Sequence, residues 1–263
     1  MPPPLASGFG KSLECQARVV GALILREMRV RFGRSQLGYL WAVTEPLAYI
    51  AVFSALFHFM DRHPPFGSSM SLFFAGGILP FQMFRNLANQ LAGAFSANQA
   101  LMTYPIVQPI DTIISRAILE VATSLFIMIV VISAFVVTGD APLPANILRI
   151  AEAIALLGLL GFGFGLMSAV IISQVSAWQN ITRLIMTPMI FISGVFYSLD
   201  TLPPTVRAVV AWNPVIHGVE MFRDGYYSNY RSGDIDPFYL FACGLLLTFV
   251  ALAMERTIRG RIE

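Results

Sequence analysis

The chain has 263 residues, of which 56% are hydrophobic and only 12% are charged. Soluble domains carry about 25% charged residues, so this composition excludes an ordinary soluble globular protein. The formal net charge is only +2, and the two cysteines lie far apart in the chain, so no disulfide framework is indicated.

Residues 12–34 predict an amphipathic helix that lies on the cytoplasmic surface of a membrane. On a helical projection, Leu13 and Met28 fall on one side, whereas Arg18 and Arg26 fall on the other. The simplest interpretation is a basic anchor that is attracted to anionic lipid. The sequence before this helix has no apolar run, so we expect neither a cleaved signal peptide nor a lipid anchor.

Six apolar segments follow, each near the length of about 20 residues that a helix needs to cross a bilayer. Lipid offers backbone amides no partners, and the alternating pattern of a membrane barrel is absent, so these spans must be helices. The predicted fold is an all-α polytopic membrane protein with one transmembrane domain over residues 1–263. The expected spans are residues 37–60, 70–92, 113–137, 150–173, 183–200 and 237–255.

The distribution of basic residues predicts the orientation of the spans. Six of the 17 Lys and Arg residues precede the first span, and three follow the last one. By the positive-inside rule, both termini are expected in the cytoplasm. The cytoplasmic connections are then residues 96–111 and 173–182, and the outward ones are residues 61–63, 138–145 and 200–236.

The first span contains one ionisable residue, Glu45, directly before Pro46. A charged group inside an apolar span is a functional candidate, and a proline within a helix loosens its hydrogen bonding. An equally good interpretation is that Glu45 lies near the cytoplasmic interface and pairs with an arginine of the N-terminal arm.

Two spacings indicate how the later spans pack. Arg116 and Glu120 lie four residues apart on the third span, so we expect them to pair with each other on one helical face. In the fourth span, Gly161 and Gly165 have the small-xxx-small spacing that lets two helices approach closely.

The outward connection over residues 200–236 is too apolar for an aqueous loop, since it includes Val209 and Trp212. We expect short helices over residues 203–230 that dip into the outer leaflet and break at Pro214. A packed extracellular cap is the alternative interpretation.

Lys11 is the only lysine, and the tripeptide Gly10-Lys11-Ser12 lacks the earlier glycine and the preceding strand of a P-loop. A Walker A site is therefore excluded, so any ATP-driven activity needs a second polypeptide. His58, Asp61 and His63 are more typical of an interfacial cluster than of a metal site. We expect no catalytic residue, no metal and no cofactor in this chain.

Three stretches follow the pattern of a known family. The first runs from Leu25 to Gly33 and continues through residues 37–46; the second covers residues 98–120. The third is Trp212-Asn213-Pro214 with His217, Glu220 and Arg223. These stretches resemble the permease subunits of capsular polysaccharide ABC exporters of the KpsM/BexB type, and more loosely their O-antigen and teichoic-acid relatives.

The resemblance implies a type-2 ABC exporter fold with an interface helix, six spans, a cytoplasmic coupling segment and re-entrant gate helices before the last span. It also implies a homodimer that works with two copies of a separate ATPase, which binds ATP and Mg²⁺. The implied function is export of lipid-linked capsular polysaccharide across the bacterial inner membrane. Periplasmic and outer-membrane export proteins are further implied partners, and nucleic acid is not.

The resemblance also assigns roles to residues. The residues implied in coupling to the ATPase are Arg26, Glu27, Arg29, Arg31, Asn98, Gln99, Pro105, Pro109 and Asp111. Those implied at the entrance or along the substrate channel are Tyr39, Trp41, Glu45, Tyr49 and Phe53. Those implied at the outer gate are Trp212, Asn213, His217, Glu220 and Arg223. The first and fifth spans are implied to face the channel.

Other functions are weighed against this one. A related exporter could carry O-antigen, teichoic acid or a drug. A membrane enzyme, such as a lipid-linked glycosyltransferase or phosphatase, would gather acidic or histidine residues on one face, and the loop carboxylates here are sparse. An ion-coupled carrier would show two similar halves, and no such symmetry is found.

Overall fold

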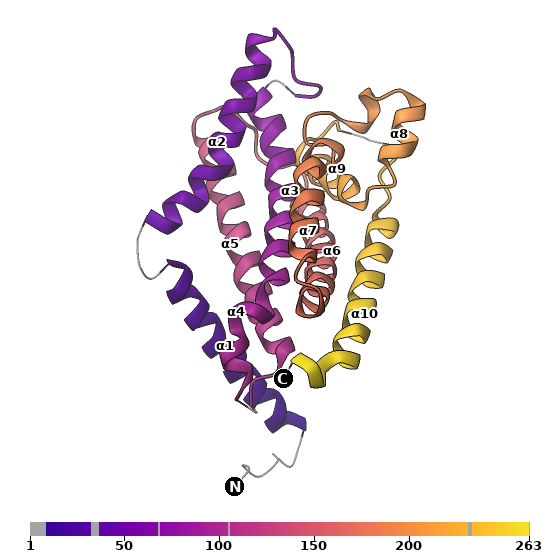
Figure 1. Ribbon diagram of the computed structural model, residues 1–263. Helices are drawn as coiled ribbons and strands as arrows, with labels where there is room; N and C mark the ends of the chain where they lie inside the picture. The colour runs from indigo at the N-terminus through magenta and orange to yellow at the C-terminus, as the bar shows by residue number, and fades with distance from the viewer. Residues whose placement is uncertain (1–8, 33–36, 68, 105, 231–232, 263) are drawn as a thin grey trace.

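The computed structural model describes residues 9–32, 37–67, 69–104, 106–230 and 233–262, and its regular elements in these ranges are all helical. The helices are α1 (Phe9–Phe32), α2 (Leu37–Phe59), α3 (Met70–Ala92), α4 (Ala94–Met102), α5 (Pro109–Val137), α6 (Ile147–Gln174), α7 (Trp178–Ile192), the short 3₁₀ helix η1 (Leu199–Thr201), α8 (Pro204–Val210), α9 (Pro214–Tyr226) and α10 (Pro237–Ile262). In Figure 1, α1, α4 and the end of α10 lie at one end of the molecule, and α8 and α9 lie at the other.

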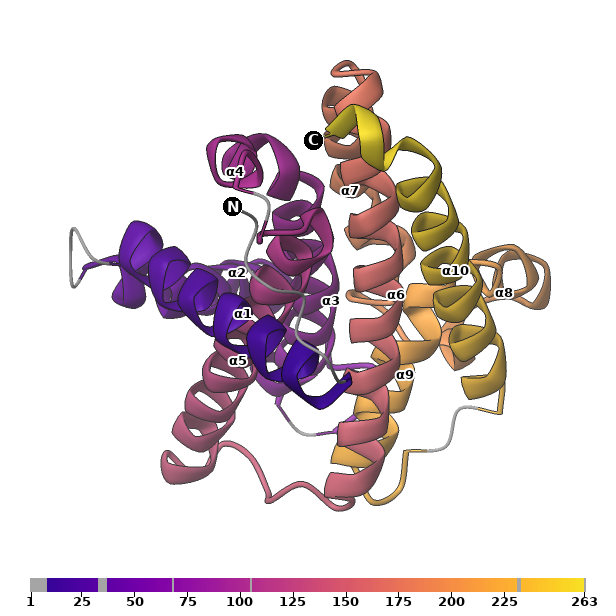
Figure 2. The ribbon, with the colours of Figure 1, turned by 90° about the horizontal axis from the view of Figure 1, so that it is seen from below.

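Helix α3 forms the centre of the bundle, where it contacts α2, α5, α6 and α9. It is buried along most of its length, and Phe73, Phe74, Phe81 and Phe84 are almost completely inaccessible. Figure 2 shows α3 between α5 on one side and α6 on the other. Because other helices cover it, α3 carries two glycines and a proline in buried positions, whereas Arg85 is half-buried.

Four of the described helices are long and apolar enough to cross a membrane. These segments are Trp41–Phe59 of α2, Pro109–Val137 of α5, Ile147–Gln174 of α6 and Pro237–Thr257 of α10. Their length and hydropathy confirm the prediction of an all-α membrane protein with several spans.

The predicted span over residues 183–200 differs from the helix that is present. Helix α7 begins already at Trp178 and ends at Ile192. Gly194 has a φ of +73°, a left-handed conformation that commonly follows the end of a helix. The chain after α7 is therefore irregular, and its carbonyl groups need partners outside the helix.

The close approach predicted for the fourth span is confirmed at α6. A Cβ atom on Gly165 would lie 2.7 Å from the Leu91 Cβ and 3.0 Å from the Ala88 carbonyl oxygen of α3. One turn earlier, a Cβ on Gly161 would lie 3.2 Å from the Phe84 carbonyl oxygen. The two glycines therefore let α6 pack directly against the backbone of the central helix.

Candidate functional site

Helix α1 is joined to α4 and α5 by four side-chain pairs, which we call the α1 seam. Figure 2 shows α1 lying obliquely across the end of the bundle that also carries α4. Gln16 donates to Asp111 at 3.0 Å, and Arg26 donates to Asn98 at 2.6 Å. The remaining two pairs are ion pairs, Glu27 with Arg116 at 2.8 Å and Arg31 with Glu120.

One face of α1 makes most of this contact. Gln16, Val20, Leu23, Glu27 and Arg31 are spaced by three or four residues, so they lie in a single row along the helix. Val20 and Leu23 are buried at the centre of the row. The side that the helical projection marked as apolar overlaps with this row, because it includes Val20. The rest of that side is more accessible, since Leu13 is 50% and Met28 is 37% exposed.

The predicted pair between Arg116 and Glu120 on one helix is wrong. Arg116 instead pairs with Glu27 and also donates to the Gln90 carbonyl oxygen at 3.1 Å. Glu120 is only 2% exposed and accepts from Arg31. Helix α1 brings opposite charges onto both residues, and these contacts between helices replace the local pair.

The segment predicted to couple to an ATPase, residues 96–111, includes most of α4 and the start of α5. Asn98 is buried and turns toward α1, whereas Gln99 is exposed. Asp111 is also buried, and it accepts from the Gln108 backbone N–H at 3.0 Å as part of a capping box at the start of α5. Pro109 is the first residue of that helix, and Pro105 lies outside the described residues.

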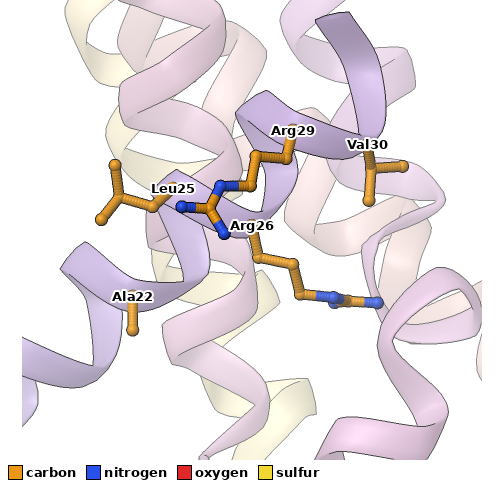
Figure 3. A pocket seen from close by; sticks show the side chains of 5 residues that line it. All are labelled: Ala22, Leu25, Arg26, Arg29 and Val30. Atoms are coloured by element: carbon orange, nitrogen blue, oxygen red, sulfur yellow. The ribbon is translucent and has the colours of Figure 1, made fainter. Parts of the chain in front are cut away.

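The exposed side of α1 forms an open depression that Figure 3 shows in detail. It is lined by Ala22, Leu25, Arg26, Arg29 and Val30. Arg26 extends toward Asn98, while the guanidinium of Arg29 stays close to Leu25 (Figure 3). Leu25 is 60% and Val30 is 68% exposed, so the depression combines a basic group with apolar surface.

The residues predicted at the channel all lie on α2. Tyr39, Trp41 and Glu45 lie in its first half, and Tyr49 and Phe53 lie in its second half. Glu45 lies 3.4 Å from Arg85 of α3, so among the residues that the structure describes its ionic partner is Arg85 and not an arginine of the N-terminal arm, as one interpretation expected. Trp41 is exposed, and the side chain of Tyr39 lies outside the described residues.

Tyr49 and Phe53 begin a row of aromatic rings that continues beyond α2. Tyr49 and Phe53 stack with their ring centroids 6.4 Å apart. Phe53 then meets Phe196 at 4.6 Å, and Phe196 meets Phe191 of α7 at 5.4 Å. Tyr49 and Phe191 are exposed at the two ends of this row, so the row links the accessible surfaces of α2 and α7.

At the opposite end of the molecule, Arg223 of α9 is completely buried and binds the chain that follows α7. Its guanidinium donates to the carbonyl oxygens of Gly194 at 2.6 Å, Val195 at 2.9 Å and Tyr197 at 3.0 Å. It also lies 4.0 Å from the centroid of the Phe73 ring. Arg223 therefore supplies the partners that the irregular end of α7 requires.

Glu220 lies one turn before Arg223 and completes a buried polar cluster. One carboxylate oxygen lies 3.3 Å from the Arg223 guanidinium, and the other accepts from the Tyr230 hydroxyl. Ser198 lies within 2.7 Å of the Tyr230 hydroxyl. Burial raises the pKa of the Glu220 carboxyl group, and the Arg223 charge and the Tyr230 hydroxyl oppose this rise. Burial, with the nearby Glu220, also raises the pKa of Tyr230, which keeps its phenol protonated as a donor.

The other predicted gate residues connect α7, α8, α9 and α10. Asn213 caps α9 by accepting from the Val215 N–H at 3.1 Å, and its amide donates to the Ile192 carbonyl oxygen at 3.1 Å. His217 Nδ1 accepts from the Asp236 N–H at 3.1 Å, so Nε2 carries the proton and donates to the Ala211 carbonyl oxygen at 2.9 Å. Trp212 is 79% exposed.

Several members of these clusters were absent from the sequence prediction, including Gln16, Arg85, Ser198 and Tyr230. Arg85 carried a signal, because it interrupts an apolar stretch. The others are ordinary polar residues whose roles depend on tertiary contacts. In the part of the chain that the structure describes, no group of three His, Cys, Asp or Glu residues is placed to hold a metal ion.

Known proteins are similar to this chain over nearly its whole length. The family model described as ABC-2 type transporter matches residues 18–227. The polysialic acid transport protein KpsM of Escherichia coli is 34% identical, over 95% of this chain and 96% of its own. The capsule polysaccharide export inner-membrane protein CtrC of Neisseria meningitidis serogroup A is 32% identical, over 98% and 97%.

A more distant relative is the O-antigen export system permease protein RfbA of Klebsiella pneumoniae, which is 24% identical over 90% of each chain. The family match includes the α1 seam except Gln16, and it includes Glu220, Arg223 and Ser198 of the buried cluster but not Tyr230. The resemblance expected from the three sequence stretches is thereby confirmed, and the chain belongs to the family of ABC-2 type transporters.

Proposed function

We propose that this chain is the permease subunit of an ATP-driven ABC transporter that exports lipid-linked capsular polysaccharide across the bacterial inner membrane. The observation that carries the proposal is the similarity over nearly the whole chain to proteins named for polysialic acid transport and capsule polysaccharide export. The apolar helices of the bundle support a location in the membrane.

The proposed topology has six spans and both termini in the cytoplasm. Helices α3 and α7 are then the second and fifth spans, in addition to the four helices that are long and apolar enough on their own. Helices α8 and α9 are the re-entrant gate helices, because they are short, α9 packs against α10, and a break at Asn213-Pro214 separates the two. This arrangement places α1 and α4 on the cytoplasmic side.

In this function, two copies of the chain work with two copies of a separate ATPase, which binds ATP and Mg²⁺. The chain has a single lysine and lacks a P-loop motif, which supports ATP hydrolysis by a separate ATPase subunit. Glu27, Arg31, Asn98 and Asp111 have partners within the chain, so we assign them to the connection between α1 and the coupling segment. We assign direct contact with the ATPase to the exposed Arg29 and Gln99.

The polysaccharide path is proposed along α2 and α7 between the two copies. The aromatic row of Tyr49, Phe53, Phe196 and Phe191, which is exposed at Tyr49 and Phe191, supports this position, since aromatic faces stack on the apolar faces of sugar rings. The cluster of Glu220, Arg223 and Tyr230 then holds the outer gate in place. Envelope-spanning export proteins are proposed to receive the polymer on the outer side.

Deletion of the gene in an encapsulated host tests the proposal. We expect the polymer to be made but retained in the cytoplasm, and to return to the surface when the wild-type gene is supplied. Normal surface polymer in the deletion strain would contradict the proposal. Affinity purification of the chain from native membranes should also recover a stoichiometric ATPase, whereas the purified chain alone should hydrolyse no ATP.

The match to an O-antigen permease supports a second candidate, export of a related glycan by the same mechanism. Chemical analysis of the polymer retained by the deletion strain separates the two candidates. Sugar transfer by the purified chain without an ATPase would instead favour a membrane glycosyltransferase.

A further inference from the structure

The two gate helices are attached to the rest of the bundle in different ways. Helix α9 packs against α6, α3 and α10, and most of its side chains are buried. Helix α8 has no buried side chain, and it makes no comparably extensive contact with another helix in the described part of the chain. Figure 1 shows α8 at the edge of the end of the molecule that also carries α9. Helix α9 is therefore part of the packed bundle, whereas α8 lies on its surface.

The C-terminal end of α9 is fastened directly to the start of α6. The Asn146 N–H donates to the Gly225 carbonyl oxygen at 2.8 Å, and the Arg149 guanidinium donates to the Asp224 carboxylate at 3.0 Å. A Cβ atom on Gly225 would lie 2.8 Å from the backbone nitrogen of Ile150, so the two backbones are in close contact. A displacement of α9 would break these bonds and open a gap in the bundle.

Helix α8, by contrast, is held firmly only at its two ends. Before it, the Leu199 side chain is completely buried. After it, the Ala211 carbonyl oxygen accepts from His217 Nε2 at 2.9 Å, and the Trp212 carbonyl oxygen accepts from the Tyr239 hydroxyl at 2.9 Å. The chain is thus anchored on both sides of α8, and the helix can turn about the line through these anchors without disturbing the buried core.

One ion pair joins the middle of α8 to the chain that precedes α10. The Arg207 guanidinium lies 2.6 Å from the Asp234 carboxylate, and the two side chains are 31% and 41% exposed. Within the described residues, this is the one side-chain hydrogen bond that α8 makes. Water and salt screen an ion pair that is this exposed, so it contributes little net stability and breaks readily.

We propose that α8 is a hinged lid on the outer gate, that the pair of Arg207 and Asp234 latches it closed, and that α9 stays fixed while the lid opens. The inference rests on the proposed export function, which places both helices at the gate, and it specifies which of the two moves. Segments that move in function come from the least stable parts of a fold, and α8 meets this description whereas α9 does not.

Reversible cross-linking in an encapsulated host tests the lid. Cys15→Ser and Cys243→Ser first remove the native thiols, and Arg207→Cys with Asp234→Cys then replaces the latch. A bis-methanethiosulfonate reagent bridges the two new cysteines, and a reductant removes the bridge. Without the reagent, the variant should export polymer at nearly the wild-type rate, because the lid is unlatched but still moves. With the bridge in place, the reappearance of surface polymer after its enzymatic removal should slow at least about tenfold, and the reductant should restore it.

The matched control places the same bridge between α9 and α6. Arg149→Cys with Asp224→Cys replaces an ion pair of similar length in the same thiol-free background. Because α9 stays fixed, the bridge at this site should leave the rate of export unchanged. Non-reducing gel electrophoresis and peptide mass spectrometry verify that each bridge forms within one chain.

Undiminished export with a complete bridge between positions 207 and 234 would overturn the inference. An equal slowing by the bridge between positions 149 and 224 would also overturn it, since α9 would then be a moving part. So would a loss of export in the unbridged latch variant at normal protein levels, because an unlatched lid should still open. Normal surface polymer in the deletion strain would instead contradict the export function itself.

Discussion

The Glu27 carboxylate of α1 lies 2.8 Å from the Arg116 guanidinium of α5, and both side chains are largely shielded from solvent. This ion pair holds the amphipathic helix against a helix that is apolar enough to cross the membrane. A movement of α1 relative to the bundle therefore acts on α5 through a short, charged contact.

Replacing Glu27 by Gln should destabilise the protein by about 2 kcal/mol, because Arg116 then keeps a shielded charge without its ionic partner. Thermal unfolding in detergent, followed by tryptophan fluorescence, measures this loss. The double variant with Glu27→Arg and Arg116→Glu should recover part of it. The control is Arg18→Gln, since Arg18 and Glu14 form an exposed pair whose loss should cost less than about 0.5 kcal/mol. Equal destabilisation by both single variants would contradict this role of the seam.

Replacing Arg223 by Met should be much more severe, with a loss of about 4 kcal/mol or a failure to accumulate in the membrane. The variant leaves Glu220 buried without its countercharge and removes the donors for three carbonyl groups after α7. Adding Glu220→Gln should restore part of the stability. Arg207→Met is the control, because Arg207 and Asp234 form a partly exposed pair near the surface. If the double variant is no more stable than Arg223→Met alone, the charge balance is not the cause.

The variant Gly165→Ala should lower stability by about 2 kcal/mol, because the new methyl group would meet the Leu91 side chain and the α3 backbone. Gly158→Ala lies on the same helix and would meet only the flexible end of Met83 at 3.4 Å. It should be neutral or slightly stabilising, since alanine favours the helix over glycine. Similar unfolding temperatures for the two variants would show that α6 and α3 are not tightly packed at Gly165.

Asn213 performs two tasks that different substitutions separate. Asn213→Ala should cost about 1 kcal/mol or more, because it removes the cap of α9 and the amide donor to the Ile192 carbonyl oxygen. Asn213→Asp keeps the cap and loses only the donor, so its loss should be smaller. Chemical unfolding compares both with Asn229→Ala, an exposed control residue. A loss as large for Asn213→Asp as for Asn213→Ala would mean that the cap contributes nothing.

The sequence predicted the helices well where the signal is local. Charge-free apolar runs are typical of membrane helices, and prolines at positions 204 and 214 mark where α8 and α9 begin. Such local signals do not predict that α7 ends at Ile192. Residues 193–199 carry no charge, so they extend the charge-free run that predicts a span, and only the buried Arg223 shows that their carbonyl groups are bound outside a helix.

For the candidate site, too, the sequence predicted local features and missed contacts between helices. Family resemblance identified Glu27, Asp111, Glu220 and Arg223 as residues of interest, but it did not identify their partners. The rule that residues four apart on a helix interact predicted a pair between Arg116 and Glu120. Helix α1 overrides that local preference, because it approaches α5 closely enough to supply both with opposite charges.

The bonds from Arg223 to the end of α7 also set an order of events during synthesis. Gly194 leaves the ribosome 29 residues before the arginine that will bind its carbonyl oxygen. Until then, the carbonyl groups that follow α7 lack the guanidinium that binds them in the folded protein. The end of α7 therefore reaches its final structure only after α9 has been made.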